Sequence, residues 1–214
     1  KKVMSQICPT VTPTTTDPHE YRDQLERVVS LSDRLQLDFM DGEFASPRAL
    51  NVAQAWWPEG KTIDIHLMYR RPLEYIETLV SLHPSLVIIH AEAEGDLAGM
   101  MTHLQGLGIR AGVALLQDTS VESVKNLISL ADHVLIFAGK LGSFGGSADL
   151  SLLSKVAEIR AFKPDIEIGW DGGANADNVR QLADGGIDVI NAGGAIQKAE
   201  NPIEAYQHLV GLIA

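Results

Sequence analysis

The chain has 214 residues, of which 45% are hydrophobic, and its formal net charge is −11. This length favours one domain, residues 1–214, over two small ones. The acidic residues are scattered, which argues against a nucleic-acid partner or an anionic membrane surface, because either would require a basic face. The negative charge does not exclude a small anionic ligand, since a few backbone N–H groups can hold one.

The single cysteine, Cys8, excludes an intrachain disulfide. A cytoplasmic location is the natural expectation for such a chain. No apolar run reaches the roughly 18 residues of a membrane span, and no long apolar segment follows Lys1–Met4. We therefore expect neither a transmembrane helix nor a signal peptide.

Short runs rich in Val, Ile and Leu recur along the chain and alternate with stretches of helical spacing. Each run is almost entirely apolar, which is typical of strands buried on both faces of a parallel sheet. In chain order the predicted strands are Met4–Pro9, Arg34–Met40, Thr62–Met68, Leu86–Glu92, Arg110–Leu116, His133–Ala138, Ile166–Asp171 and Val189–Ala192.

The intervening stretches carry helix signals. Asp17-Pro18, Arg71-Pro72 and Asn201-Pro202 predict helix starts with proline in the first turn. Eight strands alternating with about eight helices predict a (β/α)₈ TIM barrel of α/β class, near the lower size limit of that fold. The alternative, a doubly wound open sheet, usually has fewer strands and a glycine-rich loop after the first strand, where this chain has Thr-Pro-Thr-Thr-Thr.

Polar residues at the ends of several predicted strands mark the candidate site. In a TIM barrel the active site lies at the carboxyl ends of the strands. Alternation turns Gln36 and Asp38 of the second predicted strand toward the barrel axis. His66 of the third strand and Asp171 of the seventh point inward by the same rule. A strand-end aspartate can simply cap the next helix, but several inward polar groups would be costly to bury unpaired.

Asp38 and Asp171 are the candidate catalytic residues. Two carboxylates on opposite sides of a carbon can exchange a proton across it, one as base and one as acid. A metal ion between them would stabilise an enediolate oxygen. The expected reaction is inversion at a carbon next to a carbonyl.

Glycine pairs follow the last three predicted strands: Gly145-Gly146, Gly172-Gly173 and Gly193-Gly194. Glycine lets backbone N–H groups approach an anion closely, and the loops after strands seven and eight often bind phosphate in this fold. One such pair could simply make a tight turn. Three pairs at neighbouring strand ends favour a phosphate site.

These segments resemble, in order and spacing, the ribulose-phosphate 3-epimerase family. The similarity lies in Asp-Phe-Met-Asp-Gly at 38–42, Asp-Ile-His-Leu-Met at 64–68 and the glycine pairs, and it extends to the first and fifth strands, so that it covers the whole chain. The resemblance implies a ribulose-phosphate-binding TIM barrel, an isomerase of pentose phosphate metabolism. It would interconvert D-ribulose 5-phosphate and D-xylulose 5-phosphate, or a related ketose phosphate, by proton transfer at C3.

The resemblance also implies residue roles. Asp38 and Asp171 match the acid–base pair, which in the family also binds a divalent metal together with the residue matching His66. The implied ion is zinc, iron, manganese or cobalt, and the implied assembly is a homo-oligomer. The residues matching the substrate-binding and phosphate-binding positions are Thr10, Met40, Met68, Gly145, Gly146, Gly173, Gly193 and Gly194.

Departures from the family pattern mark a divergent member. Gln36 stands where the family has a histidine metal ligand. A glutamine oxygen is a weak neutral ligand, whereas imidazole suits zinc and iron, so we expect the metal site to be weakened, shifted toward harder ions or absent. Phe137 replaces a methionine, Gly194 replaces a serine, and the segment 139–146 lacks the family's Asn-Pro-Gly turn.

Two other functions stay open. One is a related sugar-phosphate decarboxylase or aldolase, although such relatives usually have a lysine among the strand-end acids and the second and third predicted strands have none. The other is a catalytically degenerate barrel that binds a sugar phosphate. His90, at the end of the fourth strand, is expected to pack or form hydrogen bonds, and Lys140 is a candidate phosphate contact or a solvated lysine.

Overall fold

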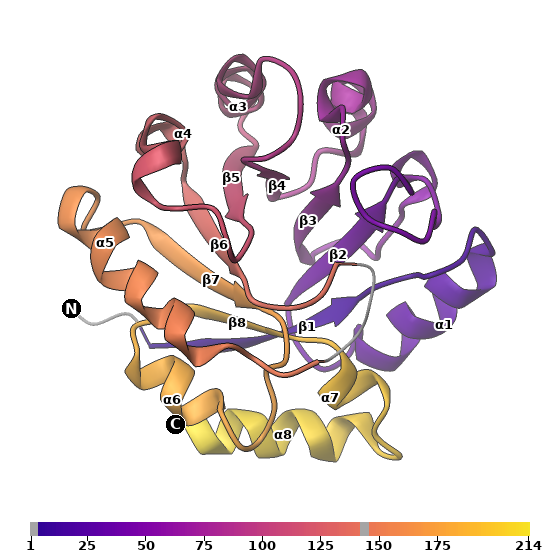
Figure 1. Ribbon diagram of the computed structural model, residues 1–214. Helices are drawn as coiled ribbons and strands as arrows, with labels where there is room; N and C mark the ends of the chain where they lie inside the picture. Colours follow the sequence, from indigo (N-terminus) through magenta and orange to yellow (C-terminus); the bar gives the residue numbers. More distant parts are fainter. Residues whose placement is uncertain (1–3, 142–145) are drawn as a thin grey trace.

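Within residues 4–141 and 146–214, which the computed structural model describes, eight parallel strands close into a barrel in chain order, and β8 pairs with β1 (Figure 1). The predicted TIM barrel is therefore confirmed. The second, third and eighth strands have the predicted bounds, and the first lies two residues further along the chain. The strands are β1 Gln6–Val11, β2 Arg34–Met40, β3 Thr62–Met68, β4 Leu86–His90, β5 Arg110–Leu115, β6 His133–Phe137, β7 Glu167–Asp171 and β8 Val189–Ala192.

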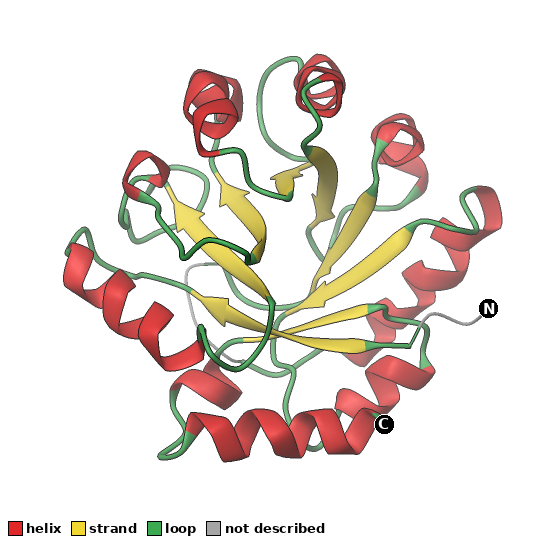
Figure 2. Ribbon diagram, turned by 180° about the vertical axis from the view of Figure 1, so that it is seen from behind, coloured by secondary structure: helices red, strands yellow, loops and turns green. Residues whose placement is uncertain are grey.

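The helices form an outer layer around the strands, as both ribbon views show (Figures 1 and 2). The α-helices are α1 Pro18–Val28, α2 Ile76–Leu82, α3 Leu97–Gly106, α4 Lys125–Leu130, α5 Ser154–Phe162, α6 Val179–Asp184, α7 Gly194–Gln197 and α8 Pro202–Ile213. Short 3₁₀ turns are η1 Val52–Gln54, η2 Pro72–Tyr75, η3 Glu122–Val124 and η4 Leu150–Leu153. None of the helices in the described ranges is long and apolar enough to cross a membrane.

The helix starts predicted from Asp-Pro and Asn-Pro are confirmed. The Asp17 carboxylate accepts a hydrogen bond from the backbone N–H of His19 at the start of α1. The Asn201 side chain accepts from two backbone N–H groups of α8. These caps satisfy donors that have no partner within the helix. The Arg71-Pro72 start differs, because the chain first makes the 3₁₀ turn η2 and only then enters α2.

Most of the apolar core lies between the strands and the helices. Leu35, Leu37 and Phe39 alternate along β2 and are buried in this layer, where Phe39 packs against Tyr21 of α1 with ring centroids 6.1 Å apart. Trp170 of β7 faces the same layer, as alternation predicts. Because these residues face the helices, their neighbours Gln36, Asp38 and Asp171 are turned into the barrel.

An ion-pair network occupies the barrel at the beginning of the strands. The guanidinium of Arg34 donates to Asp64 at 2.8 Å and to Glu167 at 2.8 and 3.0 Å, and His133 lies 2.8 Å from Glu167. Burial would raise the pKa of Glu167, but hydrogen bonds from His133 and Arg34 outweigh it and hold that pKa well below its usual range. Asp64 thus belongs to this network, although it shares the inward face of β3 with His66.

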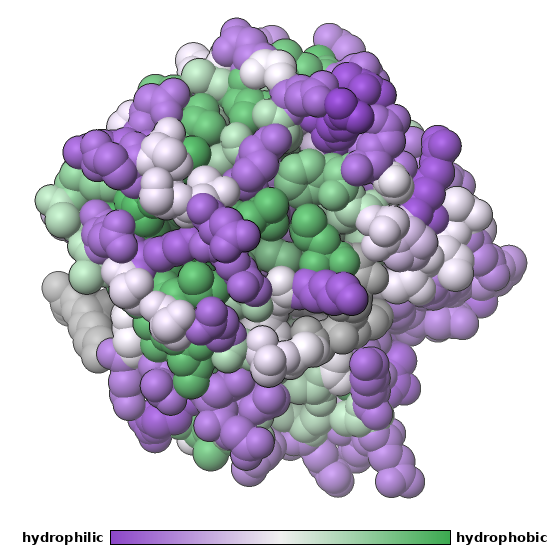
Figure 3. Space-filling view, viewed as in Figure 1, coloured by the Kyte–Doolittle hydropathy of each residue, from purple (hydrophilic) through white to green (hydrophobic). Residues whose placement is uncertain are grey.

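The face seen in Figure 1 has apolar residues grouped toward its middle, and hydrophilic residues prevail around its edge (Figure 3). The described residues that directly follow β6 pass in front of the strands in this view (Figure 1). The barrel mouth is therefore partly covered by its own loops, which is the setting in which this fold builds binding sites.

Candidate active site

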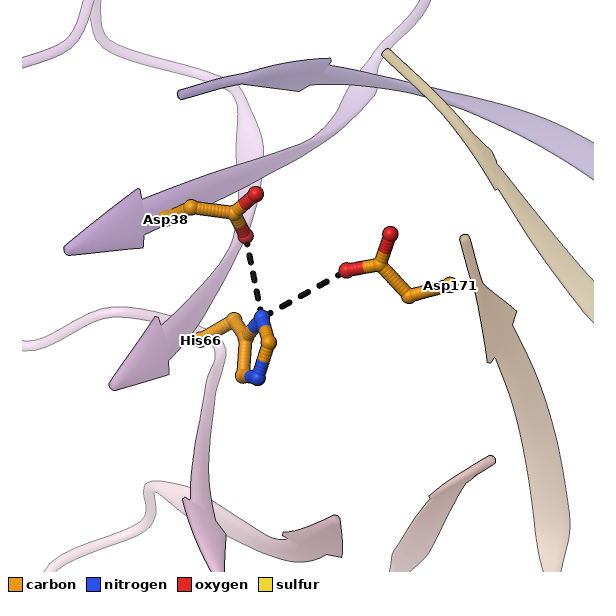
Figure 4. A group of neighbouring side chains, drawn as sticks. All are labelled: Asp38, His66 and Asp171. Carbon is orange, nitrogen blue, oxygen red and sulfur yellow. Dashed lines mark hydrogen bonds and ion pairs between the residues drawn. The ribbon is translucent and has the colours of Figure 1, made fainter. Parts of the chain in front are cut away.

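Polar side chains from β2, β3 and β7 meet inside the barrel. The strand register places Asp38 beside His66 on neighbouring strands. His66 Nδ1 lies 3.1 Å from Asp38 Oδ1 and 3.4 Å from Asp171 Oδ2, so that one ring nitrogen faces both carboxylates (Figure 4). The structure therefore brings together the two aspartates and the histidine that the strand alternation turned inward.

The burial of this group shifts its protonation equilibria. Burial alone would lower the pKa of His66, but hydrogen bonds to Asp171 and Asp38 and their charges outweigh it and raise the pKa to about 9. Burial and the neighbouring charge of Asp171 raise the pKa of Asp38 above its usual value. At neutral pH, and without a bound cation, His66 is thus an imidazolium between two acids.

Gln36 lies between the same two carboxylates. Its Nε2 donates to Asp38 Oδ1 at 2.9 Å and to Asp171 Oδ2 at 2.7 Å. These are the oxygens that His66 Nδ1 also faces, so two nitrogens and two oxygens form a closed ring of contacts. Gln36 Oε1 is buried and has no hydrogen-bond partner among the described residues, which is costly for an amide oxygen.

The group can hold a divalent cation. Asp38, His66 and Asp171 each offer one ligand atom, and these atoms lie within 4.8 Å of one another. A half-turn of the Gln36 amide would exchange Oε1 for Nε2 and present an oxygen to the same space. The unpaired Oε1 thus gives the site a possible fourth ligand, of the hard oxygen type that suits manganese better than zinc. The donor set fits a metal ion.

A pocket opens above the two aspartates. Its space, counted out to the open solvent, is about 730 Å³. Asp38 and Asp171 line it, and so do most of the predicted substrate and phosphate residues: Thr10, Met68, Gly146, Gly173, Gly193 and Gly194. Met40 is buried beside Met68 and is not among the lining residues. Gly145 lies outside the described residues.

Glycine is required where the loops after β6 and β7 meet. Gly172 and Gly173 have φ of +124° and +69°, a region that side chains disfavour. A Cβ on Gly172 would lie 2.0 Å from the backbone nitrogen of Gly139, and one on Gly173 would lie 2.5 Å from that of Ala148. The two loops therefore approach each other closely at the rim of the pocket, where only glycine fits.

Sequence reasoning missed two residues of the site. Thr12 lines the pocket and its hydroxyl donates to Asp38 Oδ2 at 2.7 Å. Asn191 of β8 also lines the pocket, and its side chain donates to the carbonyl of Trp170 at 3.1 Å. The available signals were weak: Thr12 shares the alternation of Thr10, and Asn191 is a polar residue within an apolar run.

The structure also places His90, Lys140 and Cys8 relative to the site. His90 is buried and lies beside His66 with the two Nε2 atoms 2.8 Å apart. Burial lowers the pKa of His90 to about 4, against the opposing effect of Glu92, so this ring is neutral. The expectation that His90 forms hydrogen bonds is thus confirmed. Lys140 lines the pocket, and Cys8 is packed in the barrel wall with burial raising the pKa of its thiol.

The fold and this geometry define a TIM-barrel protein with a polar site at the carboxyl ends of its strands. The chain matches the family described as ribulose-phosphate 3 epimerase over residues 7–197. It is 33% identical over 184 residues to a ribulose-phosphate 3-epimerase of Helicobacter pylori, covering 81% of this chain and 83% of that protein. A Mycobacterium leprae ribulose-phosphate 3-epimerase is 31% identical over 186 residues, or 83% of each chain. The chain belongs to the ribulose-phosphate 3-epimerase family.

Solved structures agree with the fold. A 3-hexulose-6-phosphate synthase superimposes with a TM-score of 0.74 at 18% identity, covering 98% of this chain and all of the other. KGPDC from Streptococcus mutans gives 0.73 at 11% identity, covering 98% of this chain and 97% of that one. At these identities the likeness concerns the barrel fold alone.

Proposed function

We propose that this chain is a pentose-phosphate 3-epimerase that interconverts D-ribulose 5-phosphate and D-xylulose 5-phosphate, or a closely related ketose phosphate. The observation that carries the proposal is the pair Asp38 and Asp171. They reach one pocket from β2 and β7, strands that β1 and β8 separate in the barrel. Family membership makes an epimerase the first choice among barrel chemistries.

The two carboxyl groups would move one proton each. One carboxylate removes the C3 proton, and the electron pair of the C–H bond forms the C2–C3 double bond of an enediolate. The other group, which must then be protonated, delivers its proton to the opposite face of C3, and the reverse reaction restores the starting state. Burial and the charge of Asp171 raise the pKa of Asp38, which is the direction that a proton-donating carboxyl group requires.

The other polar residues would hold and orient this pair. A divalent cation held by Asp38, His66 and Asp171 supplies positive charge that stabilises the enediolate oxygen. Thr12 fixes the orientation of Asp38 through its hydroxyl, and Gln36 bridges the two carboxylates when no cation lies between them. The proposed ion is zinc, iron, manganese or cobalt, and the oxygen of Gln36 favours the harder manganese.

The substrate would lie with its phosphate at the glycine-lined rim. Thr10 and Met68 are proposed to face the sugar, with Met40 packed beside Met68, and the backbone at Gly145, Gly146, Gly173, Gly193 and Gly194 is proposed to hold the phosphate. A cytoplasmic location, a homo-oligomeric state and the absence of nucleic-acid and membrane partners stay predictions. So does the organisation of residues 1–214 as one domain.

Asp171→Asn tests the mechanism. The amide keeps the shape but cannot take a proton, so we expect loss of deuterium incorporation at C3 of D-ribulose 5-phosphate in D₂O, followed by NMR. Asp177→Asn is the matched control, because Asp177 is exposed in the following turn. This variant should catalyse deuterium incorporation at the wild-type rate. Exchange retained by Asp171→Asn would refute the two-aspartate mechanism.

A barrel that binds a sugar phosphate without catalysis is the second candidate. The hydrogen bonds of Gln36 to both carboxylates favour it, because the amide occupies the space between the groups that must act on C3. Wild-type protein that binds D-ribulose 5-phosphate by calorimetry but shows no C3 exchange, with manganese or cobalt present, would decide for this candidate. Turnover of a keto-acid sugar phosphate would instead point to a decarboxylase or aldolase, although neither β2 nor β3 contains a lysine.

A further inference from the structure

The polar contacts of the site do not end at His66 but continue to β4 and the segment after it. His66 Nε2 lies 2.8 Å from His90 Nε2, and His90 Nδ1 lies 3.1 Å from Glu92 Oε1. Both imidazole rings are completely buried, with centroids 5.0 Å apart. Asp38, His66, His90 and Glu92 therefore form one continuous row, with Glu92 at its outer, partly exposed end.

Glu92 is held in place from its other side. Its Oε2 accepts hydrogen bonds from the hydroxyl of Thr119 at 3.0 Å and from the backbone N–H of Leu116 at 3.4 Å. The backbone donor cannot change its role, because a peptide N–H only donates. The orientation of the carboxylate is therefore set by the segment after β5, and Oε1 is left to face His90.

The direction of the hydrogen bonds follows from Glu92. An ionised carboxylate only accepts, so His90 Nδ1 must carry the hydrogen between the two groups. In a neutral His90 the other nitrogen, Nε2, is then a bare acceptor. It can accept only if His66 Nε2 carries a hydrogen, and this leaves His66 Nδ1 as the nitrogen whose lone pair can be freed toward Asp38 and Asp171.

We propose that His90 and Glu92 are positioning residues that keep the hydrogen of His66 on Nε2, so that His66 Nδ1 is available to a cation between Asp38 and Asp171. Only the mention of the cation rests on the proposed function. The direction of the hydrogen bonds rests on the contacts alone. Partners of this kind around a ligating histidine typically change metal affinity by about 10- to 100-fold.

Glu92→Gln should reverse the donor and acceptor direction of the hydrogen bonds along this row while keeping nearly the same side-chain shape. The amide oxygen should take the place of Oε2, because the N–H of Leu116 requires an acceptor there. The NH₂ group then donates to His90 Nδ1, His90 carries its hydrogen on Nε2, and His66 Nε2 must accept. His66 Nδ1 is left with the hydrogen and can no longer bind a cation without breaking the row.

Two measurements without substrate test the proposal. The ¹⁵N chemical shifts of the imidazole rings in cation-free protein should place the His90 hydrogen on Nδ1 in the wild type and on Nε2 in Glu92→Gln. Titration with Mn²⁺ alone, followed by the EPR signal of the free ion, should show about 10- to 100-fold weaker binding in Glu92→Gln. Glu94→Gln is the control, because Glu94 is exposed two residues away and pairs with Arg70 at the surface. It should keep the wild-type affinity.

The outcomes separate this proposal from the epimerase proposal. If His90 of the wild type carries its hydrogen on Nε2, the proposed direction of the hydrogen bonds from His66 to Glu92 is wrong, whether or not the protein has epimerase activity. Unchanged Mn²⁺ affinity in Glu92→Gln, or no Mn²⁺ binding by the wild type, would overturn the role toward the cation. Glu92→Asp keeps an acceptor and should retain the wild-type tautomer, which keeps the test decisive if Glu92→Gln does not fold. Correct tautomers and affinities without epimerase activity would count only against the proposed function.

Discussion

Gln36→Leu should destabilise the protein when no cation is present. The substitution keeps the approximate volume but removes two hydrogen bonds to carboxylates, at 2.9 and 2.7 Å, each contributing about 1.5–3 kcal/mol. It also removes the buried Oε1, which has no partner among the described residues. Loss of this unpaired atom should stabilise the folded state by about 1–3 kcal/mol. The net loss should be about 2–3 kcal/mol, or a fall of roughly 4–12 °C in Tm for a chain of this size.

Thermal unfolding in the presence of a chelator measures this effect. Gln181→Leu is the matched control, because Gln181 is exposed on α6 and should leave Tm within about 2 °C of the wild type. Added Mn²⁺ should reduce the difference between Gln36→Leu and the wild type, because a cation can replace the amide as partner of both carboxylates. A Gln36→Leu protein as stable as the wild type in chelator would show that the amide does not bridge the two acids.

Two further predictions concern the two ends of the barrel. Glu167→Gln should cost about 3 kcal/mol at pH 7 by leaving Arg34 without one of its carboxylates. Because the folded-state pKa of Glu167 is depressed, its contribution is present above an unfolded-state pKa of about 4.3 and is lost as the pH falls below it. Urea unfolding should therefore show the difference shrinking below about pH 4, and a constant difference would contradict the ion-pair assignment. Gly173→Ala places a Cβ 2.5 Å from the backbone nitrogen of Ala148 and should raise KM for the sugar phosphate by several-fold. Gly211→Ala is the control, because a Cβ there has no described atom within 4 Å, and it should leave KM unchanged. Equal KM values for the two variants would argue against a phosphate site at this rim.

Strand periodicity made the centre of the site predictable. In a closed parallel barrel the period of two fixes which side chains face the axis, so Asp38, His66 and Asp171 could be placed together before any coordinates were known. The bounds of β2 and β3 matched the prediction because their apolar runs begin and end sharply. The family resemblance, now confirmed, depended on the same segments.

The hydrogen bonds within the site were not predictable. Thr12 was missed because the first strand was predicted to end at Pro9, whereas β1 extends to Val11 and brings the next residue, Thr12, within hydrogen-bond distance of Asp38. The amide of Gln36 could be assigned only a weak ligand role, since its contact with Asp171 joins strands that are not neighbours and depends on barrel closure. The row from His66 to Glu92 depends on side-chain rotamers on β3, on β4 and in the segment after β4, for which residue spacing carries no signal.

The two polar layers inside the barrel use different partners, and this difference bears on function. At the beginning of the strands, Glu167 is paired with Arg34, a permanent cation that keeps the carboxylate ionised. At the carboxyl ends, the described partners of Asp38 and Asp171 are an amide, a hydroxyl and the imidazole of His66. An imidazole can gain or lose a proton near neutral pH, whereas a guanidinium keeps its charge. An acid–base pair needs partners that can be exchanged for a proton or a metal ion, and the carboxyl-end layer is the one that has them.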